Sequence, residues 1–149
     1  MPAKAYLYAY PLVIMDETRT AMGSLNEGST NHLDHVMPDH NFRSVVRPNN
    51  NTLYSIGWLD LTQSRVVLTV PHTERYYVMP FMDAWTNVFT TVGTRETGSE
   101  AGAYVVTGPD WQGELPSDQA TSIAVNLHSI SPRRGRRCLP YALRSPTFQ

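Results

Sequence analysis

Alternating apolar and polar positions run through the middle of the chain and predict a β-rich fold. Five segments are rich in β-branched and aromatic residues, which is typical of strands. They are Thr52–Asp60, Arg65–Val70, Arg75–Phe81, Asn87–Val92 and Ala103–Thr107. Turn signals separate these segments about every ten residues, a spacing that favours an antiparallel sheet or one face of a sandwich. Between the second and third segments, Pro71–Glu74 is expected to form the turn of a hairpin. We also expect Pro80 at a strand end or a bulge, because proline cannot donate to a strand ladder.

The chain before these strands has the apolar spacing of a helix. From Ala3 to Met22 the apolar residues follow a helical stripe, and Gly23 is placed to end the helix. The stripe consists of Tyr6, Leu7, Tyr10, Ile14 and Met22. Pro11 should kink this helix or mark its true first turn. We interpret the segment as a core-packing helix, so the expected fold class is β-rich α+β, with an N-terminal helix packed on an antiparallel sheet or sandwich.

The character of the sequence changes after Pro116. Residues 117–149 include the run SPRRGRRCLP, which is basic, rich in Pro and Gly and without a clear period. Such a run is typical of a poorly ordered tail, or of a segment that packs on another chain. We therefore expect a β-rich domain with a helical lead-in over 1–116 and an atypical tail over 117–149.

Composition limits the classes of function. The chain has 149 residues, 41% of them hydrophobic, which is enough for one domain with a real core. A net charge of −1 gives no overall field that would recruit nucleic acid. The lone Cys138 excludes an internal disulfide and a cysteine-built zinc site. No apolar run is long enough for a transmembrane segment. We interpret the start as mature protein rather than a signal peptide, because Pro11 and Asp16 interrupt the expected pattern.

A polar turn and a later segment are candidates for the floor of a ligand cleft. The turn begins at Arg47, which Pro48 should hold in an extended conformation at the mouth of a strand, and three asparagines follow. The later segment places Asp83 between apolar and aromatic residues, where a carboxylate pairs with a cation or has a raised pKa. Our first hypothesis is a strand-end cleft that binds a polar or anionic small molecule. Its expected lining is Arg47, Asn49, Asn51, Tyr54, Trp58, Asp83, Trp85, Asn87 and Arg95, with Tyr77 as a further aromatic wall. The alternative for the asparagines is that they only tie the turn together, and for Asp83 that it forms a structural pair.

Two other kinds of chemistry stay open. A hydrolase would use Asp83 or His35 as general base, with Arg95 stabilising negative charge. A metal site could form from His32, His35 and His40, with Asp34 and Asp39 nearby, although Pro38 breaks any helix that would bring all of them together. The chain has no GxSxG elbow, phosphate loop or dinucleotide fingerprint, so no cofactor is expected.

Several ordered motifs resemble one bacterial family. They are AYLYAYPLVIM, FRSVVRPNNNTLYS with His35 upstream, WLDL, VVLTVP, RYYVMPFMDAWTNVF and GTRETG. Together, from about residue 5 to 116, they resemble the domain of unknown function 1254, which is usually followed by a second domain, number 1214. The resemblance implies a β-rich module with a helical lead-in, without an established reaction.

Further expectations follow from this resemblance alone. Members are normally exported, which implies a periplasmic or secreted location. Many have aspartate where this chain has Asn51, so a carboxylate is lost there. The segment after Pro116 departs from the family pattern and resembles a truncated product. The resemblance then implies a face left bare for the missing second domain, for a partner chain or for a further copy in a homo-oligomer.

Overall fold

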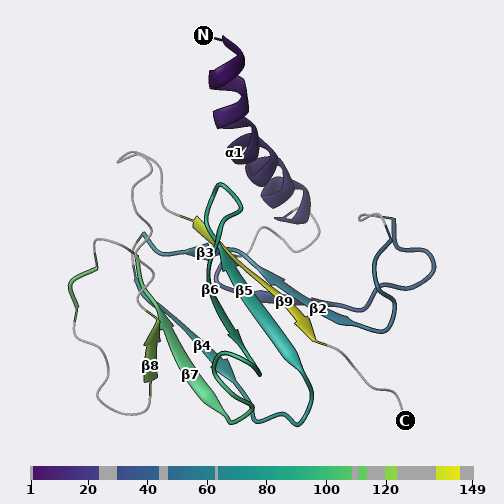
Figure 1. Ribbon diagram of the computed structural model, residues 1–149, viewed down its shortest axis with the longest axis vertical. Coiled ribbons are helices and arrows are strands. Elements are labelled where there is room, and N and C mark those ends of the chain that lie inside the picture. Colours follow the sequence, from purple (N-terminus) through teal and green to yellow (C-terminus); the bar gives the residue numbers. More distant parts are fainter. Residues whose placement is uncertain are drawn as a thin grey trace.

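The computed structural model describes residues 2–23, 30–43, 47–62, 64–108, 111–113, 120–123 and 137–144. Within these residues, one helix stands beside two β-sheets (Figure 1). The helix is α1 (Pro2–Gly23), and the strands are β1 (Leu33–Val36), β2 (Leu53–Gly57), β3 (Leu59–Asp60), β4 (Val66–Val70), β5 (Tyr77–Met82), β6 (Val88–Gly93), β7 (Gly102–Val106), β8 (Ala120–Ile123) and β9 (Arg137–Arg144). The expected β-rich α+β class is confirmed.

The larger sheet has the order β1-β2-β9-β5-β6, with β3 paired to β9, and all of its pairs are antiparallel. Its inner face shows most clearly on β5, where Tyr77, Met79 and Phe81 are buried and the residues between them are only partly covered. Pro80 lies inside β5, next to a bulge between Phe81 and Met82. Pro80 itself is paired with Thr91 of β6, so it lies neither at the expected strand end nor at the bulge, which follows one residue later.

The smaller sheet has the order β4-β7-β8. This arrangement corrects the hairpin expected between the second and third strand segments, because β4 pairs with β7 whereas β5 pairs with β6 and β9. The chain therefore passes from one sheet to the other between Val70 and Tyr77. The reason is burial, since β4 and β5 can each turn an apolar face toward the other only when they lie in different layers.

The core forms where the two sheets meet. Phe81 and Val92 of the larger sheet and Val106 of the smaller one are completely buried, and Tyr104 packs in the same cluster. Burying side chains of this size contributes roughly 1.5–3 kcal/mol each to folding. These contacts fix the distance between the sheets and therefore the shape of any cavity between them.

Two strands come from the segment expected to be a tail. β8 pairs in parallel with β7, and β9 lies between β2 and β5. The sequence pattern predicted neither strand. The rest of 117–149 lies outside the described residues, so the expectation of a poorly ordered tail is not addressed there.

Helix α1 projects away from the sheets (Figure 1). Its expected core-packing stripe is exposed instead, with Tyr6 at 63% and Leu7 at 71% of their full accessibility. This corrects the expected role of the stripe, because the buried core cluster consists of strand residues and Leu61, which follows β3, and includes no residue of α1. Pro11 lies inside the helix and leaves the carbonyl of Leu7 without its usual backbone partner. Over the residues that are described, no helix has the length and apolar character needed to cross a bilayer.

Candidate functional site

A pocket of about 120 Å³ opens between the two sheets. One wall comes from β1, β2 and β5 of the larger sheet, and the other comes from β4 and the segment that follows it. The lining residues are Leu33, His35, Ser55, Leu68, Thr69, Val70, Pro71, Thr73, Tyr77 and Met79. Most of this surface is apolar, with a few polar groups set into it, which is the usual composition of small-molecule sites.

His35 and Ser55 form the polar centre of this pocket. They are directly opposite each other on β1 and β2, so both side chains project from the same face of the sheet. The imidazole Nδ1 and the hydroxyl Oγ are 2.7 Å apart, which is hydrogen-bond distance. Ser55 is buried, whereas His35 is exposed at the edge of the sheet. The pair therefore links the interior of the pocket to solvent.

A second cavity of about 330 Å³ adjoins the first. The two share Leu33, His35, Leu68 and Thr69, so they meet along one wall. The second cavity extends between the β1 and β4 edges toward Asn31, His32 and Phe81. Its volume lies in the range typical of small-molecule sites. Together the cavities form a groove, defined here as the inter-sheet groove, with His35 at the junction.

Tyr77 lies at the inner end of the first pocket and is buried. Its hydroxyl donates to the carbonyl of Gly98 at 3.4 Å. Burial raises the pKa of this phenol above its ordinary value of 10.0, and a hydrogen bond with Thr97 opposes that rise. Tyr77 is thus a neutral, polar group at neutral pH. Its ring lines the inter-sheet pocket and not the strand-end cleft in which it was expected.

The residues expected around Arg47 lie at one end of the larger sheet. Leu53 at the start of β2 and Tyr77 at the start of β5 are both opposite Arg144. The turn that carries Arg47 therefore leaves the sheet at this end. The backbone amide of Asn49 donates to the Tyr54 hydroxyl at 3.0 Å, which ties the turn to the strand.

Within this turn, Asn51 contacts the hydroxyl of its neighbour Thr52 at 3.4 Å. Arg47 has φ 54° rather than the extended conformation expected before proline. A non-glycine residue in this region is strained, so the turn holds Arg47 against its own preference and that of Pro48. The predicted turn is present, but the predicted conformation of Arg47 is wrong.

Asp83, Trp85 and Asn87 lie in the β5–β6 loop at the other end of the sheet, toward α1 (Figure 1). The carboxylate of Asp83 accepts from the backbone amides of Trp85 at 2.8 Å and Asn87 at 2.9 Å. Its second oxygen accepts from the Asn87 side chain at 2.9 Å. The Trp85 indole donates to the carbonyl of Tyr8 at 3.3 Å. This loop is therefore held together by its own polar groups and supports the helix.

The structure does not bring Arg47 and Asp83 into one cleft. Met82 is opposite Leu139, whereas the Arg47 end of the sheet is marked by Arg144. Five residues of β9 separate these points, or about 17 Å along a strand. The expected strand-end cleft is therefore divided between two ends of the sheet.

Arg95 and Trp58 also lie apart from the lining of the inter-sheet groove. Arg95 lies in the turn after β6. Its guanidinium is 5.7 Å from the ring centroid of Tyr76. Trp58 is buried between β2 and β3, and its Nε1 has no hydrogen-bond partner in the described part of the chain. Of the expected catalytic residues, only His35 lines the groove.

The histidines expected as metal ligands do not converge. His32 Nε2 is 3.9 Å from an Asp34 carboxylate oxygen, while His35 contacts Ser55 instead. The carbonyl of His40 accepts from Arg43 in a separate turn. Among the residues that the structure describes, no three His, Cys, Asp or Glu side chains gather as a metal site would require.

Sequence reasoning missed Ser55 and the β4 wall of the groove. The strand pattern placed Ser55 on the same face as Leu53 and Gly57, so a buried serine was a detectable signal. Its partner was not detectable, because the pairing of β1 with β2 joins residues 20 positions apart. The β4 wall depends on the packing of one sheet over the other, which no local pattern specifies.

The fold and the groove define a two-sheet β module with an inter-sheet pocket. The chain belongs to the family described as protein of unknown function DUF1254, whose model matches residues 30–137. A search of curated proteins gives no match. The fold is similar to that in the crystal structure of the VPA0106 protein from Vibrio parahaemolyticus, a structural genomics target, with a TM-score of 0.70 and 21% identity. That similarity covers 97% of this chain and 32% of the other, so the chain spans about a third of the length of VPA0106.

Proposed function

We propose that this chain binds a small molecule in the inter-sheet groove, with an apolar body against Leu33, Leu68 and Met79 and one polar group at His35 and Ser55. The observation that carries the proposal is the 2.7 Å contact of His35 with Ser55 inside an apolar wall. An imidazole and a hydroxyl can each donate or accept, so they suit a carboxylate, carbonyl or hydroxyl head group. The proposed ligand differs from the polar or anionic one expected from sequence, because neither Arg47 nor Arg95 lines the groove.

Ligand-observed NMR tests this proposal with short-chain and aromatic carboxylic acids and the corresponding alcohols as probes. We expect weak binding of at least one class, and we expect His35→Gln or Ser55→Ala to lower the affinity about tenfold, the loss of one hydrogen bond. Leu68→Trp should fill the groove and abolish binding. His72→Gln is the matched control, because His72 is exposed, lies outside the lining and contacts Glu100 at 3.5 Å. Equal loss in His72→Gln, or binding unaffected by Leu68→Trp, would contradict the proposal.

A second candidate function is hydrolysis, which the same contact favours. A hydroxyl within hydrogen-bond reach of an imidazole has the geometry of a nucleophile beside its base. In this reaction Ser55 Oγ attacks an ester carbonyl while its proton passes to His35, and the imidazolium then protonates the leaving alcohol. Water completes the cycle by hydrolysing the acyl group from Ser55. Asp83 and Arg95, expected earlier as base and anion-stabilising group, lie outside this site.

A fluorophosphonate probe distinguishes the two candidates, because it labels only an activated serine. Hydrolysis requires labelling that disappears in Ser55→Ala and in His35→Gln but persists in His72→Gln. Reversible binding without labelling supports the binding function alone. Labelling retained in Ser55→Ala would remove Ser55 from the reaction.

A further inference from the structure

Helix α1 contacts the rest of the molecule along one side. The rings of Tyr8 and Trp85 lie 5.7 Å apart, and the Trp85 indole donates to the Tyr8 carbonyl. Tyr8 is still 66% exposed. Leu12, Met15 and Arg19 follow it at helical spacing and are partly shielded from solvent. At about 100° per residue, these four positions mark the side of α1 that faces the sheets.

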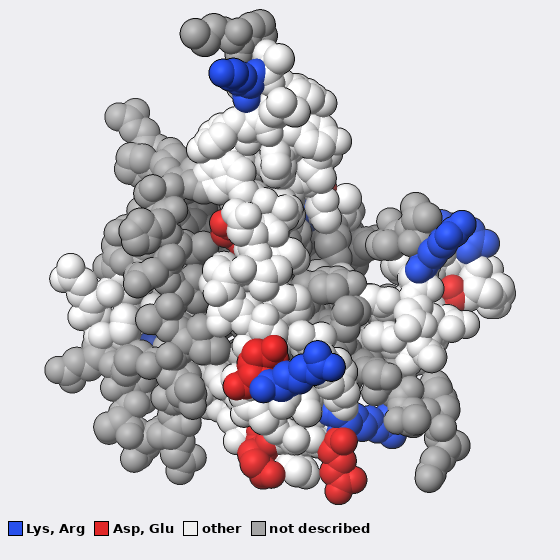
Figure 2. Space-filling view, viewed as in Figure 1, with Lys and Arg blue, Asp and Glu red and all other residues white. Residues whose placement is uncertain are grey.

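The opposite side of α1 carries an exposed apolar stripe. Its members recur at the i, i+1, i+4, i+7 and i+8 positions typical of a helix that packs on another helix. They are Tyr6, Leu7, Tyr10, Val13 and Ile14, defined here as the α1 stripe, and their exposure ranges from 44% to 71%. The rings of Tyr6 and Tyr10 contact each other at 5.4 Å. Figure 2 shows that the surface over α1 is uncharged along most of its length in this view. A helix that used this stripe to pack on the rest of its own chain would turn the stripe toward the sheets.

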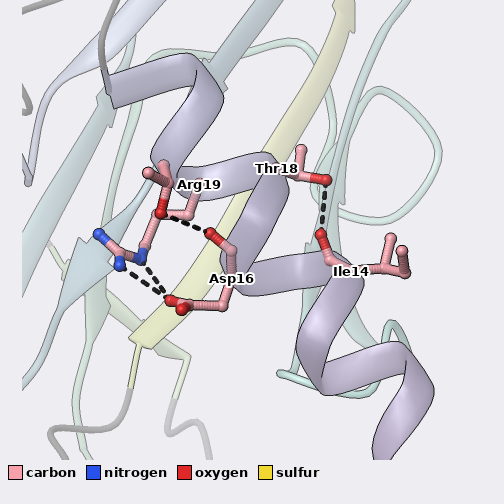
Figure 3. A network of polar contacts seen from close by, with 5 residues as sticks. Ile14, Asp16, Thr18 and Arg19 are labelled. Carbon is pink, nitrogen blue, oxygen red and sulfur yellow. Dashed lines mark hydrogen bonds and ion pairs between the residues drawn. The ribbon is translucent and has the colours of Figure 1, made fainter.

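The charges of α1 indicate what covers this stripe. Asp16 is paired with Arg19 within the helix at 2.8 Å (Figure 3). Glu17 continues the α1 stripe at its C-terminal end, and Lys4 lies near the N-terminal end. Two copies in parallel would place Glu17 against Glu17. Two antiparallel copies centred on Tyr10 would place each Glu17 beside the positive N-terminal end of the other helix, which is favourable. Lys4 lies at the same level along the axis, about 120° round the helix from Tyr10, so its long side chain would have to reach toward the stripe.

We propose that α1 is a self-association helix whose exposed stripe packs antiparallel against the same stripe of a second copy of this chain. The interface would have two-fold symmetry and use one patch twice. Five side chains of this size bury roughly 500 Å² per copy, at the low end of specific interfaces, so we expect a micromolar dimer. A membrane surface suits the helix less well, because its two basic residues, Lys4 and Arg19, are balanced by two acidic ones and do not form the lysine- and arginine-rich face that binds anionic lipid. This inference is independent of the inter-sheet groove.

Sedimentation equilibrium of the full chain tests the proposal. We expect a monomer–dimer equilibrium that Tyr10→Glu shifts by at least tenfold toward monomer. Ala5→Glu is the matched control, since it adds the same charge to an exposed position of α1 outside the stripe. Circular dichroism should show unchanged folding in both variants. A monomer at 100 µM (on the order of a hundredfold above a micromolar Kd), or equal effects of the two variants, would overturn the proposal.

Charge reversal tests the orientation. Glu17→Lys should weaken the dimer several-fold, and adding Lys4→Glu should restore it, because the pair of opposite charges returns in antiparallel copies. In a parallel dimer, Glu17→Lys leaves like charges facing each other and the double variant restores nothing. Binding to vesicles of zwitterionic and anionic lipid is the final arm. Lipid binding that Tyr10→Glu abolishes, in a chain that stays monomeric, would assign the stripe to a membrane surface and overturn self-association.

Discussion

The carboxylate of Asp83 is fully used by its own loop, where it accepts from two backbone amides and one side-chain amide. A position between apolar and aromatic residues suggested a functional carboxylate. The structure supports the alternative of a structural group, although its partners are loop amides and not the cation that was expected. Short polar side chains often bond to amides two residues ahead, so this alternative could be weighed from sequence.

We expect Asp83→Ala to lower the free energy of unfolding by about 1–3 kcal/mol, because the amides of Trp85 and Asn87 lose the charged acceptor that they share. Asp83→Asn should cost less, since one oxygen still accepts from the amides of Trp85 and Asn87. Urea denaturation measures both changes. Ligand binding in the inter-sheet groove should be unaffected in the folded fraction, and a stable Asp83→Ala protein that had lost only binding would contradict this assignment.

Tyr77 should make the stability of the folded protein fall at high pH. Because its pKa is raised in the folded protein, the unfolded chain ionises first as pH rises past 10.0. The stabilisation is complete below that pH and is lost between it and the higher folded pKa. We expect the urea midpoint of the natural chain to fall more steeply between pH 9.5 and 11 (roughly the range around an ordinary tyrosine pKa) than that of Tyr77→Phe. Parallel curves for the two proteins would show that Tyr77 is not the group responsible.

At the scale of elements, local patterns identified the strands better than their partners. The segments at 65–70 and 75–81 were correctly expected to be strands, because β-branched and aromatic residues dominate both. The prediction that these two strands form a hairpin was wrong. A short connection can join neighbouring strands of one sheet, and it can equally join strands of two different sheets. β9 was not predicted, for a different reason. A central strand is recognised by its neighbours, β2 and β5, which lie far away in the sequence.

Removal of β9 should unfold the larger sheet. β2 and β5 do not pair with each other, and each uses β9 as its neighbour. A chain that ends after residue 136 should lose amide dispersion in NMR spectra and bind a hydrophobic dye. A chain that ends after residue 144 keeps β9 and is the control. A well-dispersed spectrum from the shorter chain would show that β9 is dispensable.

At the scale of the whole molecule, composition and pattern predicted the β-rich α+β class that the structure shows. They did not predict the groove, because its walls come from two sheets and its polar centre from a pair of strands. The sequence pattern also predicted that the apolar stripe of α1 packs into the core, whereas the structure leaves it exposed. A helical stripe such as Tyr6 and Tyr10 shows only that some surface will cover it, and the sequence does not say whether that surface lies in the same chain.

The position of β9 in the sequence also determines when the larger sheet can form during synthesis. Residues 53–57 leave the ribosome before their neighbour at 137–144, which follows about eighty residues later, so β2 waits with an unpaired edge. Long-range pairing of this kind is slow to form and leaves apolar strands open to other nascent chains. Production in cells should therefore depend on chaperones that shield the first half of the chain until the last central strand arrives.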